Sequence, residues 1–220
     1  MRKTEFANEE YYHIYNRGVD KREVFCVDMD YTRFLEAIRF TNNQKTYFGL
    51  SDFKRKSANR PPRSAVADLG GLESLKLVDI ICYCLNPNHY HFILKQKIEG
   101  GISIFMGKLG NSYTKYFNTK YSRSGSLFQG RYKSVHIDSN EYLLYLSAYV
   151  NANHFIHGYK EKNWPYSSYL DYTGKRDGKL CQKEVILGQF DNDFSQYEKY
   201  LTDNAMYLKE KKEMEKYVLE

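Results

Sequence analysis

Two histidines separated by a single residue, His89 and His91, are the side chains of this 220-residue chain best suited to chemistry. They lie in the segment HYHFIL, whose apolar and aromatic residues predict a β-strand. Alternate residues of a strand point to the same face, so both imidazoles leave one side of a sheet. Neutral imidazoles bind divalent metals, and two of them leave positions for a third ligand and for substrate oxygens. Taken alone, such a pair is more often two polar residues on a solvated face.

Basic residues are unevenly distributed along the chain. The formal net charge is +6, yet residues 101–136 contain six basic and no acidic residues, and residues 53–67 contain five basic and no acidic ones. The chain also has 22 tyrosines. This pattern is typical of a polyanion-binding surface, because Lys and Arg meet phosphates and exposed aromatic rings stack on bases. A solvated basic face, with the tyrosines packed in the core, is the other interpretation.

The hydrophobic periodicity places the histidine strand inside a recognisable order of elements. It predicts a strand, a helix, a two-stranded hairpin, a helix, a short strand region and a helix, at residues 11–17, 28–42, 77–94, 102–121, 127–137 and 139–153. Asp28 and Ser139 are the predicted N-caps. The order β-α-β-β-α-β-α indicates an α+β fold, a ferredoxin-like (split βαβ) antiparallel sheet with helices on one face and one added helix.

The rest of the chain is harder to assign. Residues 44–76, which hold the basic stretch and a Pro-Pro pair, read as a long, partly mobile loop, and loops of this length are usually functional or disordered. The segment WPYSSYLDY is expected to be irregular but packed, and a charged helix is expected from about residue 192. We therefore predict a main domain over residues 1–175 and a C-terminal helical extension over 176–220.

Composition also predicts a compartment. No run approaches the roughly 18–20 apolar residues that span a bilayer. The first residues lack the apolar stretch of a secretory signal, and four cysteines in a chain of this length do not resemble a disulfide framework. These features predict a reduced, cytoplasmic protein without a membrane partner.

Three motifs together resemble a known family. LNPNHYHFIL, GSLFQGRYKS and AYVNANHFIHG ahead of WPYSSY are similar to the HUH single-tyrosine transposases, and most of all to the REP-associated tyrosine transposases, which are related to the transposases of the smallest insertion sequences. The resemblance covers roughly residues 10–172. Two departures are a tyrosine between the histidines, where the family spells PNHVHLLL, and His154 after Asn153, where the family commonly has Asn-Pro.

The resemblance implies an HUH endonuclease that nicks and joins single-stranded or hairpin DNA, as a monomer or homodimer near the nucleoid. His89, His91 and Asn153 would hold Mg²⁺ or Mn²⁺, and Tyr149 would attack the phosphate, giving a 5′-phosphotyrosine and a free 3′-OH. Tyr149 precedes the amide residue by four positions, a spacing that puts both on one helix face. Tyr145, one turn earlier, is the alternative nucleophile, and His154 is a possible competitor for the metal.

The predicted DNA contacts follow the same motifs. Arg131 and Lys133 lie in the best-matched motif, Lys115 and Lys120 on the basic helix, and Arg17 at the end of the first strand. Two other functions stay open. A domesticated, non-cleaving binder of DNA hairpins would keep the fold but would not need the histidine, tyrosine and asparagine set. An RNA-binding module would use the same sheet, but the sequence lacks a clear aromatic RNP pattern.

Overall fold

The computed structural model describes residues 5–45, 76–159 and 163–218, with side chains up to residue 210. Most of the loop predicted over 44–76 lies outside the described residues. No helix in the described ranges is long and apolar enough to cross a membrane.

Four strands form one antiparallel sheet: β1 (Tyr11–Arg17), β2 (Val78–Asn86), β3 (His89–Gln96) and β4 (Lys133–Ile137). The strand order β2-β3-β1-β4 is that of a split βαβ fold, as predicted. The first strand therefore lies beside the histidine strand, although 71 residues separate the two in sequence. The register sets Tyr15 opposite His91, and Asn86 of the hairpin opposite His89.

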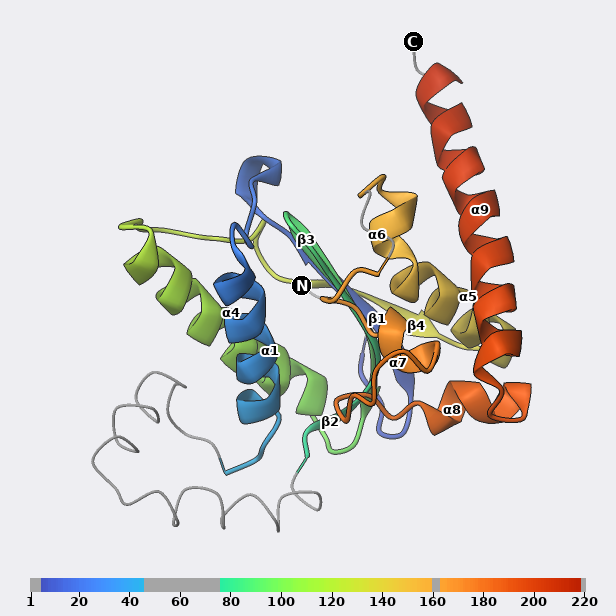
Figure 1. Ribbon diagram of the computed structural model, residues 1–220. Coiled ribbons are helices and arrows are strands. Elements are labelled where there is room, and N and C mark those ends of the chain that lie inside the picture. The colour runs from blue at the N-terminus through green and yellow to red at the C-terminus, as the bar shows by residue number, and fades with distance from the viewer. Residues whose placement is uncertain (1–4, 46–75, 160–162, 219–220) are drawn as a thin grey trace.

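Helices cover both faces of the sheet (Figure 1). The two helices of the split βαβ unit, α1 (Asp28–Thr41) and α4 (Gly101–Lys120), pack on one face, as expected. On the opposite face lie α5 (Asn140–Asn151) and α6 (Asn153–Ile156), backed by the long α9 (Phe194–Val218). The sequence predicted helices on one face only, and this part of the prediction was wrong: the C-terminal half of the chain forms a second helical layer on the opposite face. Short helices η1 (Val19–Lys21), α7 (Tyr169–Tyr172), α8 (Glu184–Leu187) and η3 (Gly188–Phe190) complete the described part.

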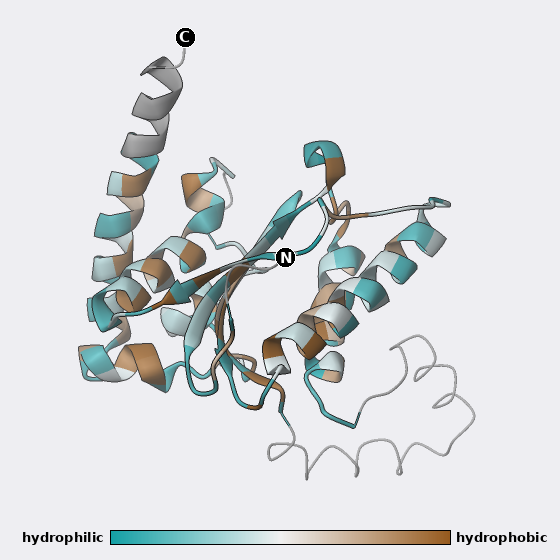
Figure 2. Cartoon of the chain, turned by 180° about the vertical axis from the view of Figure 1, so that it is seen from behind, coloured by the Kyte–Doolittle hydropathy of each residue, from teal (hydrophilic) through white to brown (hydrophobic). Residues whose placement is uncertain are grey.

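The α1/α4 face is filled by aromatic rings. Phe34 of α1 packs on Tyr90 and Phe92 of β3 and on Tyr113 of α4. Because Tyr90 enters this layer, its neighbours His89 and His91 face the other way, as strand alternation predicts. In Figure 2, hydrophobic segments (brown) are found in the strands and in the helices packed on them, and hydrophilic segments (teal) are found at turns and helix ends.

The N-cap of α1 is not the predicted residue, and the residue that caps the helix also binds Lys120, one of the predicted DNA contacts. Asp28 is the first helical residue and Val27 the N-cap, while the cap acceptor is Asp30, which receives the N–H groups of Cys26 and Val27. The buried Asp30 carboxylate also receives Lys120 Nζ at 2.6 Å. Burial alone would raise the pKa of Asp30, but the Lys120 and tyrosine hydrogen bonds hold it below the usual value. The Lys120 ammonium thus ties α4 to α1.

The long helix α9 is joined to α5 by a buried polar network. Tyr197 of α9 accepts a hydrogen bond from Asn151 Nδ2 at 2.8 Å and lies 3.0 Å from the Ser147 hydroxyl. Ser168 in turn donates to Asn151 Oδ1 at 2.5 Å. Ser139 caps α5 as predicted, receiving the N–H of Tyr142. The helix that carries the predicted nucleophile is therefore fixed at its N-terminus and along its outer side.

The WPYSSY segment lies along the outer edge of β2. Leu85 donates its N–H to the Tyr166 carbonyl, and Ser168 donates its own to the Tyr83 carbonyl. Trp164 donates its indole N–H to the Leu85 carbonyl at 2.8 Å. Its ring is nearly parallel to that of His154, with the centroids 6.3 Å apart. Residues 164–168 are irregular but packed, as predicted, and they brace α6 against the hairpin. The last four residues of the segment predicted to be irregular, Tyr169–Tyr172, instead form the helix α7.

Candidate functional site

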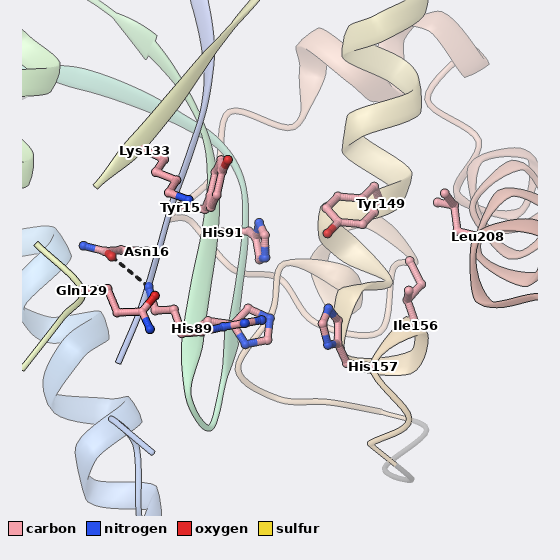
Figure 3. A pocket seen from close by; sticks show the side chains of 11 residues that line it. Tyr15, Asn16, His89, His91, Gln129, Lys133, Tyr149, Ile156, His157 and Leu208 are labelled. Carbon is pink, nitrogen blue, oxygen red and sulfur yellow. Dashed lines mark hydrogen bonds between the residues drawn. The ribbon is translucent and has the colours of Figure 1, made fainter. Parts of the chain in front are cut away.

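A cavity of about 540 Å³ lies between the histidine face of the sheet and the helices α5 and α6 (Figure 3). The sheet contributes side chains from β1, β3 and β4, and the helices contribute theirs from the opposite wall. The lining residues are Tyr15, Asn16, Arg17, His89, His91, Gln129, Lys133, Tyr149, Ile156, His157 and Leu208. Both predicted histidines, the predicted tyrosine and two predicted basic residues thus meet in one space.

The hydrogen bonds around His89 define its tautomer. Asn88 donates its side-chain N–H to the Lys21 carbonyl at 3.1 Å, which leaves its Oδ1 facing the imidazole. That oxygen lies 2.5 Å from His89 Nδ1, so Nδ1 is the nitrogen that carries the proton. The lone pair is then on Nε2, which faces Asn86 Nδ2 at 2.9 Å and Asn153 Oδ1 at 3.2 Å. His89 therefore presents a neutral nitrogen towards Asn153.

His91 is buried, with 7% of its surface exposed, and its Nδ1 lies 2.9 Å from Nε2 of His13 on β1. The two rings are nearly parallel. Burial lowers the pKa of His13 to about 4 and that of His91 well below its usual value. Both imidazoles are therefore neutral at neutral pH, and the nitrogen of His91 that is not bonded to His13 is Nε2.

Tyr149 of α5 faces the histidine strand across the cavity (Figure 3). Its ring centroid lies 5.5 Å from that of His91, with the planes perpendicular. Burial raises the pKa of Tyr149, whereas hydrogen bonding to the Asn153 side chain opposes the increase. Tyr145 lies towards α9: burial raises its pKa, and Tyr207 of α9 adds to the increase. Of the two candidate nucleophiles, Tyr149 alone lines the cavity.

The helix that was predicted to carry both Tyr149 and Asn153 is broken between them. The helix α5 ends at Asn151, and Ala152 separates it from α6, which begins at Asn153. The break does not remove the predicted neighbourhood, since Asn153 lies within hydrogen-bonding distance of His89 and Asn86. The amide residue and the tyrosine therefore belong to two helices that meet at the cavity.

Asn86 was not predicted, yet it occupies the middle of the site. Its buried Nδ2 donates to Asn153 Oδ1 at 2.6 Å and faces His89 Nε2 at 2.9 Å. Two acceptors thus converge on one positively polarised N–H₂ group. Their own separation of 3.2 Å is close to the roughly 3 Å between adjacent ligands of an octahedral ion with bonds of about 2.1 Å. Two imidazole nitrogens and an amide oxygen are donor types that suit such an ion.

No three His, Cys, Asp or Glu side chains converge as a metal site within the ranges that the structure covers. A metal in this cavity would therefore depend on the Asn153 amide in addition to the two histidines. The Asn153 side-chain nitrogen is buried and makes no hydrogen bond of ordinary geometry to the described residues. A buried amide nitrogen is costly unless it is paired, and the Tyr149 hydroxyl, whose hydrogen bonding to the Asn153 side chain opposes the rise in its pKa, is the group that can pair with it.

The predicted DNA-binding residues divide between the two faces of the sheet. Arg17 and Lys133 line the histidine cavity. Lys115 and Arg131 line an open groove of about 1000 Å³ on the α4 side. Asn16, next to Arg17, belongs to the lining of both. The histidine cavity and the α4-side groove therefore adjoin at the ends of β1 and β4. Lys120, the remaining predicted DNA contact, is instead bonded to Asp30.

Three further histidines, His13, His154 and His157, lie near the site or near its helices, and the sequence pattern alone did not show their positions. His154 is buried beside Trp164 and Tyr169 and lines a different, mainly apolar cavity, so it does not meet His89 or His91. His157 lines the histidine cavity, and His13 contacts His91. The fold class held a signal for His13: in a split βαβ sheet the first strand adjoins the third, and His13 shares a face with Tyr15 and Arg17.

Comparisons with known proteins bear on the family resemblance and on the fold. The family model for IS200-like transposases matches residues 70–153, which include both histidines, Tyr149 and Asn153. A solved structure of a REP-associated tyrosine transposase bound to a REP hairpin shares the fold, with a TM-score of 0.50 and 13% identity, over 83% of this chain and 97% of that one. No curated protein sequence matches the chain. The resemblance predicted from the motifs, and the fold class, are thereby confirmed.

Proposed function

We propose that this transposase-like chain nicks and rejoins single-stranded DNA, with Tyr149 as the nucleophile. One observation carries the proposal: a tyrosine from α5 faces two histidines of β3 across a single cavity that is open to solvent and lined by Arg17 and Lys133. Neither packing nor DNA binding alone requires this set of groups.

The proposed step forms one bond and breaks another. The Tyr149 oxygen attacks phosphorus, the bond to the 3′ oxygen breaks, and the products are a 5′-phosphotyrosine and a free 3′-OH. The phenol proton is released and the leaving 3′ oxygen takes one up, so no proton is consumed. The ester keeps the bond energy, so a 3′-OH can rejoin the strand without a nucleotide cofactor.

The raised pKa of Tyr149 makes activation necessary, because a phenol is a poor nucleophile at neutral pH. His89 Nε2, His91 Nε2 and Asn153 Oδ1 would hold Mg²⁺ or Mn²⁺. When bound, the ion would neutralise charge on the scissile phosphate. The Asn153 amide would also stabilise the phenolate, since hydrogen bonding to it opposes the increase in the Tyr149 pKa that burial causes. Arg17 and Lys133 would hold the flanking phosphates.

The groove on the α4 side suits the paired part of a hairpin. It is about twice as large as the histidine cavity, is open, and is lined by Lys115 and Arg131. Paired DNA in this groove would lead its single-stranded end past Asn16 into the cavity. The similar transposase of known structure is bound to a hairpin, which supports this class of substrate.

The direct test is incubation of the protein with labelled single-stranded oligonucleotides and Mn²⁺. We expect a covalent protein–DNA adduct that is stable to denaturation and carries the 5′ end of one fragment. Tight binding of hairpin DNA without an adduct on any single strand would instead favour a binder that does not cleave.

The division of the basic residues predicts two separable salt effects. With a single-stranded ligand, Lys133→Ala is expected to reduce the slope of log affinity against log salt by about 0.7, one phosphate contact, and Arg131→Ala to leave it unchanged. With a hairpin duplex, Arg131→Ala is expected to reduce it by about 0.9. Each variant controls for the other. Equal slopes for wild type and both variants would show that these residues are merely solvated.

A further inference from the structure

His13 and His91 form a buried pair of imidazoles on one face of the sheet. His13 is 7% exposed, as is His91, and their nitrogens approach to 2.9 Å. Both come from the middle of adjacent strands, and the register sets Tyr15, not His13, directly opposite His91. The contact is therefore diagonal across β1 and β3, and it requires His13 on the same sheet face as the cavity.

The proton in this contact can sit on only one of two nitrogens when both rings are neutral. If His91 Nδ1 carries it, His13 Nε2 accepts, and the His91 lone pair is on Nε2. If His13 Nε2 carries it, His91 Nδ1 accepts, and His91 Nε2 is protonated and cannot bind a cation. The identity of the donor thus decides whether His91 is a competent ligand.

The neighbouring histidine shows the first arrangement. Asn88 Oδ1 accepts from His89 Nδ1 and leaves Nε2 facing Asn153 and Asn86. Ligating histidines in metal sites generally donate their second N–H to an outer acceptor, which fixes the ring and its tautomer. His13 is the acceptor at the corresponding position beside His91.

We propose that His13 is a positioning residue that accepts the Nδ1 proton of His91 and so holds the His91 Nε2 lone pair ready for a divalent cation. The inference rests on the proposed metal-assisted function, but it concerns a step before DNA is bound. The binding event that it concerns is that of the divalent cation alone.

The test uses the full chain, Mn²⁺ without DNA, and ¹⁵N-labelled histidine. In the wild type, two-dimensional NMR of the ring nitrogens is expected to show His91 protonated at Nδ1. His13→Met removes the hydrogen-bond acceptor and keeps a side chain of similar length. This variant is expected to bind Mn²⁺ 10–100-fold more weakly, with the His91 tautomer shifted towards the Nε2-protonated form. His13→Gln supplies an amide oxygen in the acceptor's place and should restore both properties towards wild type.

Three results would overturn the inference: a wild-type His91 protonated at Nε2, unchanged Mn²⁺ affinity in a folded His13→Met protein, or failure of folded His13→Gln to recover either property. The wild-type spectrum decides the matter if the variants do not fold. Because these readouts need no cleavage, they remain interpretable if Tyr149 proves not to be the nucleophile.

Discussion

Tyr149→Phe is expected to abolish the covalent protein–DNA adduct while leaving DNA affinity within about twofold of wild type. The substitution removes one oxygen and keeps the ring that packs perpendicular to His91. Phenylalanine has no group that can form the phosphate ester, so the loss should be complete rather than partial. Binding survives because the histidines, Asn153 and the basic residues are unchanged. Denaturing gels with 5′- and 3′-labelled strands measure the adduct, and anisotropy measures affinity.

Tyr145→Phe is the matched control, since it makes the same change one turn earlier on α5. Tyr145 lies towards α9, outside the cavity lining, so this variant should form the adduct at a normal rate. A Tyr149→Phe protein that cleaves normally, with a labelled peptide mapping elsewhere, would refute the assignment of the nucleophile.

His91→Ala is expected to reduce metal-dependent cleavage by at least about a thousandfold. A bound cation contributes several kcal/mol of transition-state stabilisation, and each 1.36 kcal/mol corresponds to about tenfold in rate. Titration calorimetry with Mn²⁺ should show the matching loss of affinity. His89→Ala should behave alike, because its Nε2 faces Asn153 Oδ1 at 3.2 Å.

The control for these variants is His136→Ala. His136 is bonded to Glu10 at the surface and does not line the cavity, so its removal should change neither Mn²⁺ affinity nor cleavage. Near-ultraviolet circular dichroism would establish that the buried substitutions keep the fold. Unaltered nicking by folded His91→Ala protein would refute the role proposed for the histidine pair.

Local sequence pattern was sufficient for most of the fold. Strand alternation predicted β1 to the residue, and apolar spacing predicted α4 within one residue of its observed ends. The break at Ala152 was not predictable, because 139–153 reads as one apolar helix and the interruption depends on how α6 meets the sheet and Trp164. The i, i+4 spacing therefore correctly predicted that Asn153 lies near Tyr149, although the single continuous helix on which that prediction was based is not present.

The site was predictable only where a motif marked it. His89, His91, Tyr149 and Asn153 occupy the motif positions to which the family resemblance assigns roles. Asn86 lies inside the same LNPNHYHFIL motif but has no such assigned role, and His13 lies outside the motifs; both take part through contacts between distant elements. Asn86 meets Asn153 across 67 residues, and His13 meets His91 across 78. Contacts of this kind depend on sheet order and register, which become visible only when the strands are placed together.

Trp164 gives the molecule a built-in optical reporter. It is the only tryptophan of the chain and is 8% exposed, so its emission should be blue-shifted and free of competing indoles. Its ring lies beside His154, the residue after Asn153, and its N–H is held by the hairpin that leads to His89. Burial lowers the pKa of His154 to about 4, so the neighbouring imidazole is not a protonated quencher at neutral pH. Small displacements of α6 on cation or DNA binding can therefore be followed as a change in intrinsic fluorescence, without a label.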